Sequence, residues 1–133
     1  MVIDSIYKKS GKFATIDAFI NAPFFNPEKM SHCLKDQLFD IIEDYSFWHW
    51  SHEDPAIYID PPAAKQVNKL DLPTLIITAE FDIGSCREIA DIFYENIPNS
   101  KKFIIENATH FMLMEKPDEF NKIVVKFLND LNN

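Results

Sequence analysis

The sequence is poor in residues that mark several common classes of protein. It contains only two glycines and two cysteines among 133 residues, and neither cysteine belongs to a CxxC pair. Cys33 and Cys86 lie far apart, so no disulfide framework or thiolate metal site is indicated, and we expect both to be buried small side chains. No apolar run approaches the roughly 20 residues that cross a bilayer, and no N-terminal signal segment is evident. We therefore expect a soluble cytoplasmic protein.

Positive charge is also scarce. The chain has 13 Lys and Arg against 21 Asp and Glu, which gives a formal charge of −8. Such a field repels phosphate backbones and anionic head groups, so we expect neither nucleic acid nor a membrane as a partner. Apolar residues, in contrast, make up 47% of the chain. They are numerous enough to form a core in a chain with the length of one domain.

The first part of the chain, up to about residue 70, reads as helical and irregular. Apolar residues at helical spacing between Phe13 and Ile20 predict a first helix, which ends before Pro23 because proline lacks a donor. Asn26 followed by Pro27 predicts the cap and the first position of a second, longer helix. Its apolar face is expected to run through Met30, Leu34, Leu38, Ile41, Tyr45 and Trp48.

The pattern changes after Pro73, where strands alternate with helices. A continuous apolar run from Thr74 to Ala79 predicts a strand that is covered on both faces, and the stretch from Lys102 to Glu106 predicts a second strand. Strand, helix, strand, helix is the α/β pattern, in which the strands are parallel.

Two helices follow these strands. Ser85 and Glu88 form a capping-box pair that predicts the start of the first helix. Pro117 followed by two acidic residues predicts the start of the last one. The first helix has a predicted apolar stripe of Ile89, Ile92 and Phe93. The last helix is expected to have a continuous buried face made of Phe120, Ile123, Val124, Phe127, Leu128 and Leu131.

Two residues suited to catalysis follow the strands directly. Asp82 comes just after the first strand and His110 just after the second, and the carboxyl ends of neighbouring parallel strands meet at one edge of a sheet. A carboxylate that accepts a hydrogen bond from one imidazole nitrogen orients the ring, and the other nitrogen can then take a proton from a nucleophile. The alternative is that Asp82 caps the following turn and that His110 is an ordinary loop histidine.

The stretch from about Leu70 to Leu131 resembles the C-terminal end of an α/β-hydrolase. "LDLPTLIITAEFD" is similar to the strand that delivers the acid of the catalytic triad, and "IPNSKKFIIENATHFMLMEKPDEFNKIVVKFL" is similar to the last strand, the histidine loop and the final helix. The resemblance implies a partial α/β-hydrolase fold, with a helical lid-like segment over residues 1–70 and a C-terminal β-α-β-α part over residues 71–133. It also implies that Asp82 is the triad acid and His110 the triad base.

The chain departs from the family pattern in three places. Ala79 and Thr109 stand where the family usually has glycine. A β-branched residue resists positive φ, so we expect a re-shaped loop and a misaimed His110 if the turn requires that conformation. The GxSxG elbow that carries the family's nucleophile is absent, because neither Gly11 nor Gly84 has the required neighbours.

Other reactive residues have simpler explanations. Ser85 is better explained as the N-cap of its helix than as a nucleophile, and Cys86 as a buried side chain. One polar cluster is interpreted as a helix end rather than a metal site: His49, His52, Glu53 and Asp54. The aromatic side chains expected to pack in the core or in an interface are Phe24, Phe25, Phe39, Phe47, Trp48 and Trp50. We predict no metal and no cofactor.

A sheet of two parallel strands leaves an edge open. The strand from Thr74 to Ala79 would have another neighbour in the complete fold, so we predict a homo-oligomer, such as a symmetric dimer, or a separate chain that supplies the N-terminal half. One functional hypothesis is the C-terminal part of an ester or acyl hydrolase that is inactive alone because it lacks the nucleophile. The other is a non-catalytic dimerisation or partner-binding module, or a truncated gene product. The sequence leaves open whether the chain is an enzyme.

Overall fold

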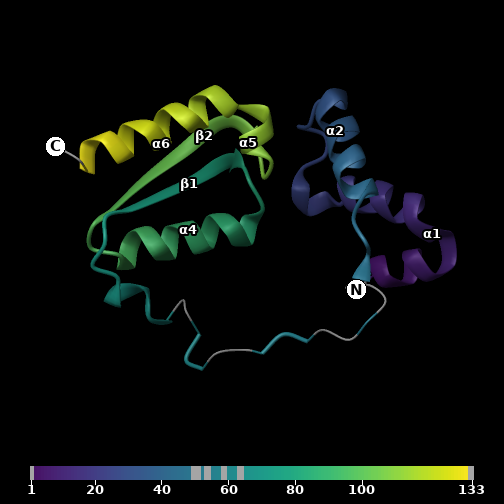
Figure 1. The fold of residues 1–133 in the computed structure, drawn as a ribbon, viewed down its shortest axis with the longest axis horizontal. Helices are drawn as coiled ribbons and strands as arrows, with labels where there is room; N and C mark the ends of the chain where they lie inside the picture. The colour runs from purple at the N-terminus through teal and green to yellow at the C-terminus, as the bar shows by residue number, and fades with distance from the viewer. Residues whose placement is uncertain (1, 49–51, 53–54, 58–59, 63–64, 132–133) are drawn as a thin grey trace. The chain divides into compact units, whose positions relative to one another are not determined.

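The chain divides into two compact units. The computed structural model describes residues 2–48, 52, 55–57, 60–62 and 65–131, and the units are Met1–Ile57 and Tyr58–Asn133 (Figure 1). The short helix η3 (Val67–Lys69) contacts helix α4 (Gly84–Asn96) of the second unit. The division therefore falls earlier than the boundary drawn between residues 70 and 71, and the assignment of residues 1–70 to a single segment stays a prediction.

The first unit begins with helix α1 (Val2–Ile20), which is kinked at Gly11. Gly11 has φ 78° and ψ −174°, a backbone conformation that residues with a Cβ rarely adopt. The Thr15 hydroxyl donates a hydrogen bond of 2.8 Å to the Gly11 carbonyl oxygen, which satisfies that oxygen at the kink. The helix ends before Pro23, as predicted.

The next long helix, α2 (His32–Glu43), begins later than predicted. The Ser31 hydroxyl accepts the N–H of Leu34 at 3.1 Å and caps the helix. Asn26 has φ 53° and instead ends the short helix η1 (Pro23–Phe25). The predicted start at Asn26 is wrong because asparagine tolerates the left-handed conformation of a C-cap, while Ser31 offers a hydroxyl acceptor nearer the helix.

Aromatic and aliphatic side chains form the core of the first unit. Phe47 is 2% exposed, and its ring stacks on that of Tyr7 with centroids 5.6 Å apart. The buried apolar side chains of this unit are Ile16, Ile20, Ala22, Phe25, Met30, Leu34, Leu38 and Phe47. Core packing of aromatic residues is therefore confirmed for Phe25 and Phe47. Trp48, predicted to extend the apolar face of α2, lies beyond the end of that helix and is partly exposed.

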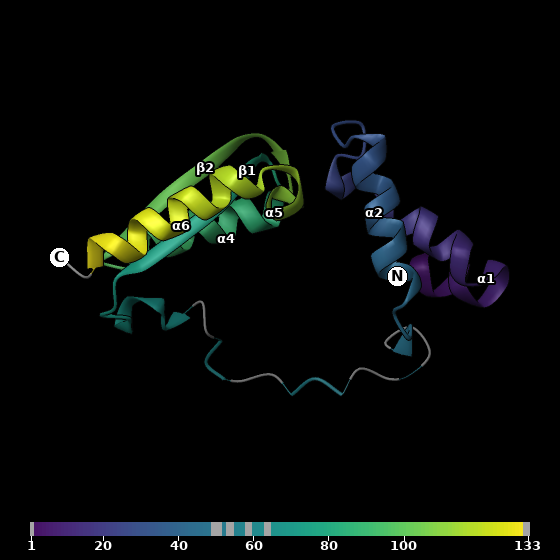
Figure 2. The ribbon, with the colours of Figure 1, turned by 45° about the horizontal axis from the view of Figure 1, so that its top comes forward.

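The second unit has a β-α-β-α arrangement. Strand β1 (Thr74–Phe81) pairs in parallel with strand β2 (Ser100–Thr109), and the short helix α5 (Met112–Glu115) follows β2. Helices α4 and α6 (Pro117–Leu131) lie on opposite faces of the sheet (Figure 1, Figure 2). The predicted fold class, a helical part followed by parallel strands that alternate with helices, is confirmed.

The core of the second unit lies between the sheet and α6. Ala79, Ile105 and Ala108 are buried at its centre. Half-buried apolar side chains surround them, namely Ile77, Met112, Phe120 and Ile123. Helix α6 has no fully buried residue, and Leu128 and Leu131 are about half exposed. The predicted continuous buried face is wrong, because the two strands found in the described part of the chain are too few to cover the whole helix.

Helix α4, on the other face, is covered just as incompletely. Ala90 is buried, whereas Ile89 and Ile92 of the predicted apolar stripe are exposed. The described helices include none that combines the length and the apolar character needed to cross a membrane.

Candidate active site

The carboxylate of Asp82 lies immediately beyond the end of β1, and several donors hold it. It is 5% exposed. Its Oδ1 accepts the backbone N–H of Ile83 at 2.7 Å, and its Oδ2 accepts the hydroxyl of Thr78 at 3.1 Å. A buried carboxylate requires such donors, because burial without hydrogen bonds costs several kcal/mol or more. Asp82 therefore does bond to the turn that follows it, but the other interactions fix the direction of the whole carboxylate.

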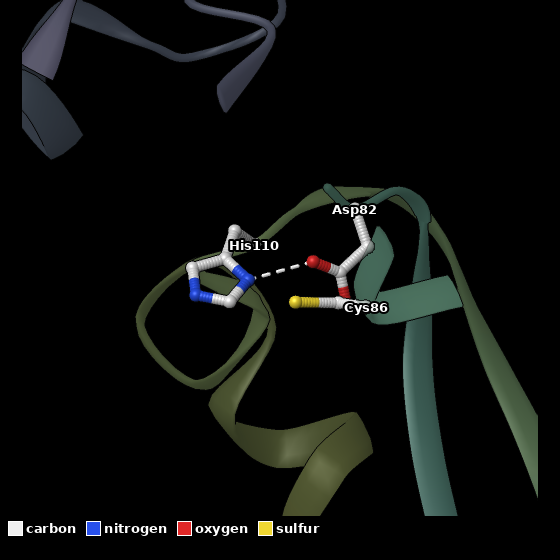
Figure 3. A group of neighbouring side chains, drawn as sticks. All are labelled: Asp82, Cys86 and His110. Atoms are coloured by element: carbon white, nitrogen blue, oxygen red, sulfur yellow. Dashed lines mark hydrogen bonds and ion pairs between the residues drawn. The ribbon is translucent and has the colours of Figure 1, made fainter. Parts of the chain in front are cut away.

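His110 follows the end of β2 and meets this carboxylate. The distance between His110 Nδ1 and Asp82 Oδ1 is 2.6 Å (Figure 3). An ionised carboxylate can only accept, so the ring donates through Nδ1–H, and in the neutral ring the lone pair lies on Nε2. Figure 3 shows Nε2 on the side of the ring that points away from Asp82. The two residues chosen from their positions after the strands are thus hydrogen-bonded to each other.

A bulge in β2 delivers His110 to this position. Ala79 is opposite Ile105, but Phe81 is opposite Thr109, so β2 contains two more residues than β1 over this interval. Within the bulge, Asn107 has φ 52°, a left-handed conformation that asparagine tolerates. The N–H of Asn107 donates to the Glu80 carboxylate at 2.9 Å, which anchors the bulge to β1.

The residue before the histidine is also held by a side chain. Both the backbone N–H and the hydroxyl of Thr109 donate to Glu115 Oε2, at 2.7 and 2.9 Å. Thr109 ends β2 and is not among the residues with positive φ. The condition for a misaimed imidazole is therefore not met, because the loop places this β-branched residue in extended backbone.

Three supporting residues escaped prediction from the sequence. Thr78 holds the acid, Glu115 holds the histidine loop, and Glu80 holds the bulge. Side chains alternate between the two faces of a strand, so Thr78 and Glu80 lie on the same face of β1. This alternation does not show whether the hydroxyl of Thr78 supports a site or is only buried in the core. No motif marks Glu115 either.

Ser85 does not have the capping role predicted for it. Helix α4 begins at Gly84, and Ile83 is at the N-cap position without a side-chain cap bond. Ser85 is exposed within the first turn. The capping-box interpretation is wrong because the helix already begins at Gly84, which places Ser85 inside the first turn rather than at the N-cap.

The two cysteines are more accessible than predicted. Cys33 is exposed and Cys86 is partly exposed, so the expectation that both are buried is wrong. Cys86 lies beside the acid and the histidine: its sulfur and one ligand atom from each of Asp82 and His110 all lie within 4.8 Å of one another (Figure 3). Helix α4 starts directly after the acid, so its first turn brings the thiol back toward the pair.

The cluster interpreted as a helix end lies largely outside the described residues. This applies to His49, Glu53 and Asp54. His52 is described: its ring stacks on Trp48 with centroids 4.7 Å apart, and its Nδ1 lies 3.0 Å from the Trp48 carbonyl oxygen.

The geometry of the Asp82 and His110 pair suits general base catalysis. The carboxylate selects the tautomer and orients the ring, and Nε2 is then the atom that accepts a proton. Because the acid is buried while the imidazole is 37% exposed, a reactant can approach the ring but not the carboxylate.

No protein-family model matches the chain, but individual proteins do. It is 26% identical over 72 residues to a proline iminopeptidase from Saccharolobus solfataricus, a match that covers 54% of this chain and 23% of the relative. It is 35% identical over 69 residues to the monoacylglycerol lipase ABHD6 from Rattus norvegicus, over 52% of this chain and 20% of the relative. The solved structure of MenH from S. aureus has a TM-score of 0.68 and 22% identity, and the likeness covers 99% of this chain and 52% of that one.

These three proteins are α/β-hydrolases. The chain has a partial α/β-hydrolase fold. It spans less than a third of the length of the curated relatives and about half of the MenH chain. The resemblance carried by the stretch from Leu70 to Leu131 is confirmed, and the α/β-hydrolase fold present here is a partial one.

Proposed function

We propose that this chain carries the acid and the base of an α/β-hydrolase acyl-transfer site. In this proposal Asp82 orients the imidazole of His110, which removes the proton from a serine hydroxyl and later returns it to the leaving group. The observation that carries the proposal is the 2.6 Å hydrogen bond between His110 Nδ1 and a buried, multiply bonded carboxylate.

The nucleophile has to come from outside these 133 residues. Gly11 and Gly84 are the only glycines in the sequence, and neither stands in a GxSxG elbow. That elbow supplies both the exposed serine and, through the following backbone N–H, part of the oxyanion hole. Either a separate chain or a longer form of the protein would provide it.

The proposed substrate is an ester, a lactone or a similar small acyl compound. The relatives include an iminopeptidase and a monoacylglycerol lipase, so their names favour no narrower class. An Asp and His pair would contribute the same proton transfer to the hydrolysis of each of these substrates. The acyl group is recognised by other parts of the site.

The first experiment asks whether the chain is inactive alone. We expect the purified chain to hydrolyse p-nitrophenyl acetate no faster than a His110→Ala variant, because a base without nucleophile and oxyanion donors contributes little. Saturation kinetics that disappear in His110→Ala would show instead that these residues contain a complete site.

The second experiment tests the pair itself. We expect a far-downfield proton NMR signal from the Nδ1–H of His110, lost in Asp82→Asn and kept in Asp71→Asn, which changes a carboxylate near the start of β1. Absence of the signal from the wild-type chain would contradict the proposed orientation of the base.

The third experiment supplies the missing half. If a GxSxG-containing stretch is encoded next to this sequence, its product is mixed with the chain, and we expect saturable ester hydrolysis that depends on His110. A mixture that forms a complex yet stays inactive would contradict the hydrolase proposal.

A second candidate function, a dimerisation or partner-binding module, rests on a different observation. Within the described residues β1 pairs with β2 alone, and apolar side chains of the same unit, such as Ile104 and Leu128, are more than half exposed. Such an edge and such faces favour association with another chain. We propose a symmetric dimer or a complex in the cytoplasm, and a monomeric mass at high concentration would contradict both.

A further inference from the structure

Cys86, Asp82 and His110 bring three different kinds of metal ligand to one point. Their ligand atoms, a thiol sulfur, a carboxylate oxygen and an imidazole nitrogen, all lie within 4.8 Å of one another (Figure 3). Cys86 lies at the start of α4, Asp82 lies in the turn after β1, and His110 directly follows β2. Ligands bound tetrahedrally to zinc at about 2.0–2.3 Å are about 3.3–3.6 Å apart, so shifts of up to roughly 1 Å in the separations of the three ligand atoms would complete the set.

We propose that this cluster binds a divalent metal ion of the zinc class. The ion would occupy the place of the proton between His110 Nδ1 and Asp82 Oδ1, whose separation would grow from 2.6 Å to about 3.3 Å. The ring proton would move to Nε2, the Cys86 thiol proton would pass to solvent, and the thiolate sulfur would complete three protein ligands.

The surroundings of the cluster fit a ligand set better than a chance meeting of side chains. The Thr78 hydroxyl bonds to Asp82 Oδ2 and the Ile83 N–H bonds to Oδ1, and bonds of this kind orient carboxylates that coordinate metals. A carboxylate and a thiolate also neutralise a 2+ ion, and one sulfur, one nitrogen and one oxygen suit a borderline-soft ion such as Zn²⁺ better than Mg²⁺ or Ca²⁺. This departs from the prediction of no metal site, because the sequence separates these ligands by up to 28 positions.

The metal-bound state and the hydrogen-bonded state of the pair exclude each other, because both use Nδ1 of His110. Metal binding would therefore switch off any base function of the histidine. The proposal does not require that function, since it depends only on the placement of the three ligands.

Cobalt provides a probe that reports the thiolate ligand directly. We expect the full, tag-free chain, kept reduced with a phosphine, to bind one Co²⁺ with a thiolate-to-metal charge-transfer band in the near ultraviolet. Zn²⁺ should abolish this band at one equivalent. The band should disappear in Cys86→Ser and remain in Cys33→Ser, the matched control in the first unit.

The other ligands give graded effects. His110→Ala should weaken Co²⁺ binding at least tenfold, and Thr78→Val, which removes only the bond to Oδ2, about tenfold. No band at saturating Co²⁺, a band that survives Cys86→Ser, or an undiminished affinity in His110→Ala would each overturn the proposal.

A measurement on the wild-type chain covers the case in which a variant does not fold. Zn²⁺ should slow the alkylation of Cys86 by iodoacetamide at least tenfold, as read by mass spectrometry, while the exposed Cys33 reacts at an unchanged rate. Equal rates at Cys86 with and without Zn²⁺ would overturn the proposal. Ester hydrolysis plays no part in either readout, so failure here leaves the acyl-transfer proposal standing.

Discussion

The two units bury polar groups for different reasons. In the first unit, the hydroxyl of the buried residue Thr15 donates a hydrogen bond to the Gly11 carbonyl oxygen at a kink in α1. In the second, the buried polar side chains Thr78, Asp82 and Thr109 gather at the carboxyl ends of the strands, around a partly exposed histidine. Buried threonine thus satisfies a backbone carbonyl oxygen in the first unit and supports the candidate active site in the second. Buried polarity points to function when it converges on a group that a reactant can reach.

The largest expected effect concerns the aromatic core of the first unit. Phe47→Ala removes a ring that is 2% exposed and stacked on Tyr7, and should lower the free energy of unfolding by about 3–5 kcal/mol. Urea unfolding followed by tryptophan fluorescence measures this, because both tryptophans lie in this unit. Phe13→Ala, at a 61% exposed ring, is the control, and an equal loss there would contradict the assigned core.

The aliphatic core of the second unit should respond nearly as strongly. Ile105→Ala removes a fully buried side chain between the sheet and α6 and should cost about 2–5 kcal/mol, measured by circular dichroism in urea. The adjacent residue provides the comparison, since Ile104 is 55% exposed and Ile104→Ala should cost far less. If both variants lose the same stability, the two faces of β2 have been assigned wrongly.

A smaller effect compares the starts of two helices. Ser31→Ala removes the hydroxyl that accepts the N–H of Leu34 and should cost about 1 kcal/mol. Ser85→Ala should change the stability by less than about 0.5 kcal/mol, because Ser85 makes no cap bond in α4. A larger loss for Ser85→Ala would restore the capping box that the sequence suggested.

A change of similar size is expected from the support of the histidine loop. Thr109→Val keeps the shape but removes one bond to Glu115, and should cost about 0.5–1.5 kcal/mol. The His110 ring resonances should shift as the loop loosens. Thr109→Ser retains a hydroxyl and should restore the wild-type resonances, and an unchanged spectrum in Thr109→Val would show that the backbone bond to Glu115 is sufficient.

The sequence predicts the architecture of the second unit because its signals are local and agree. A continuous apolar run such as Thr74 to Ala79 predicts a buried strand, and parallel strands bring the residues after their ends together. That rule brought Asp82 and His110 to one edge of the sheet, and the resemblance to an α/β-hydrolase implied that they are an acid and base pair. The helix beginning at Pro117 was predicted equally well, since proline and acidic residues both favour a helix start.

The features that the sequence could not predict depend on the directions of side chains and on helix faces that the small sheet leaves uncovered. The bonds of Thr78 and Glu115 arise only after the bulge in β2 sets the register. The open faces of α4 and α6 follow from a two-stranded sheet, whereas apolar periodicity only shows which side chains seek burial. Asn26 was predicted to be an N-cap but is the C-cap of η1, because asparagine is common at both ends of helices and its type alone does not distinguish them.

The bonds from Thr109 to Glu115 close a small ring within the chain itself. Both partners lie in one continuous stretch, six positions apart, with the histidine between them, so the contact that closes the loop is local. The seven residues 109–115 thus close the histidine loop by themselves, whereas the bulge anchored by Glu80 sets the position of His110 and the carboxylate of Asp82 sets the direction of its ring.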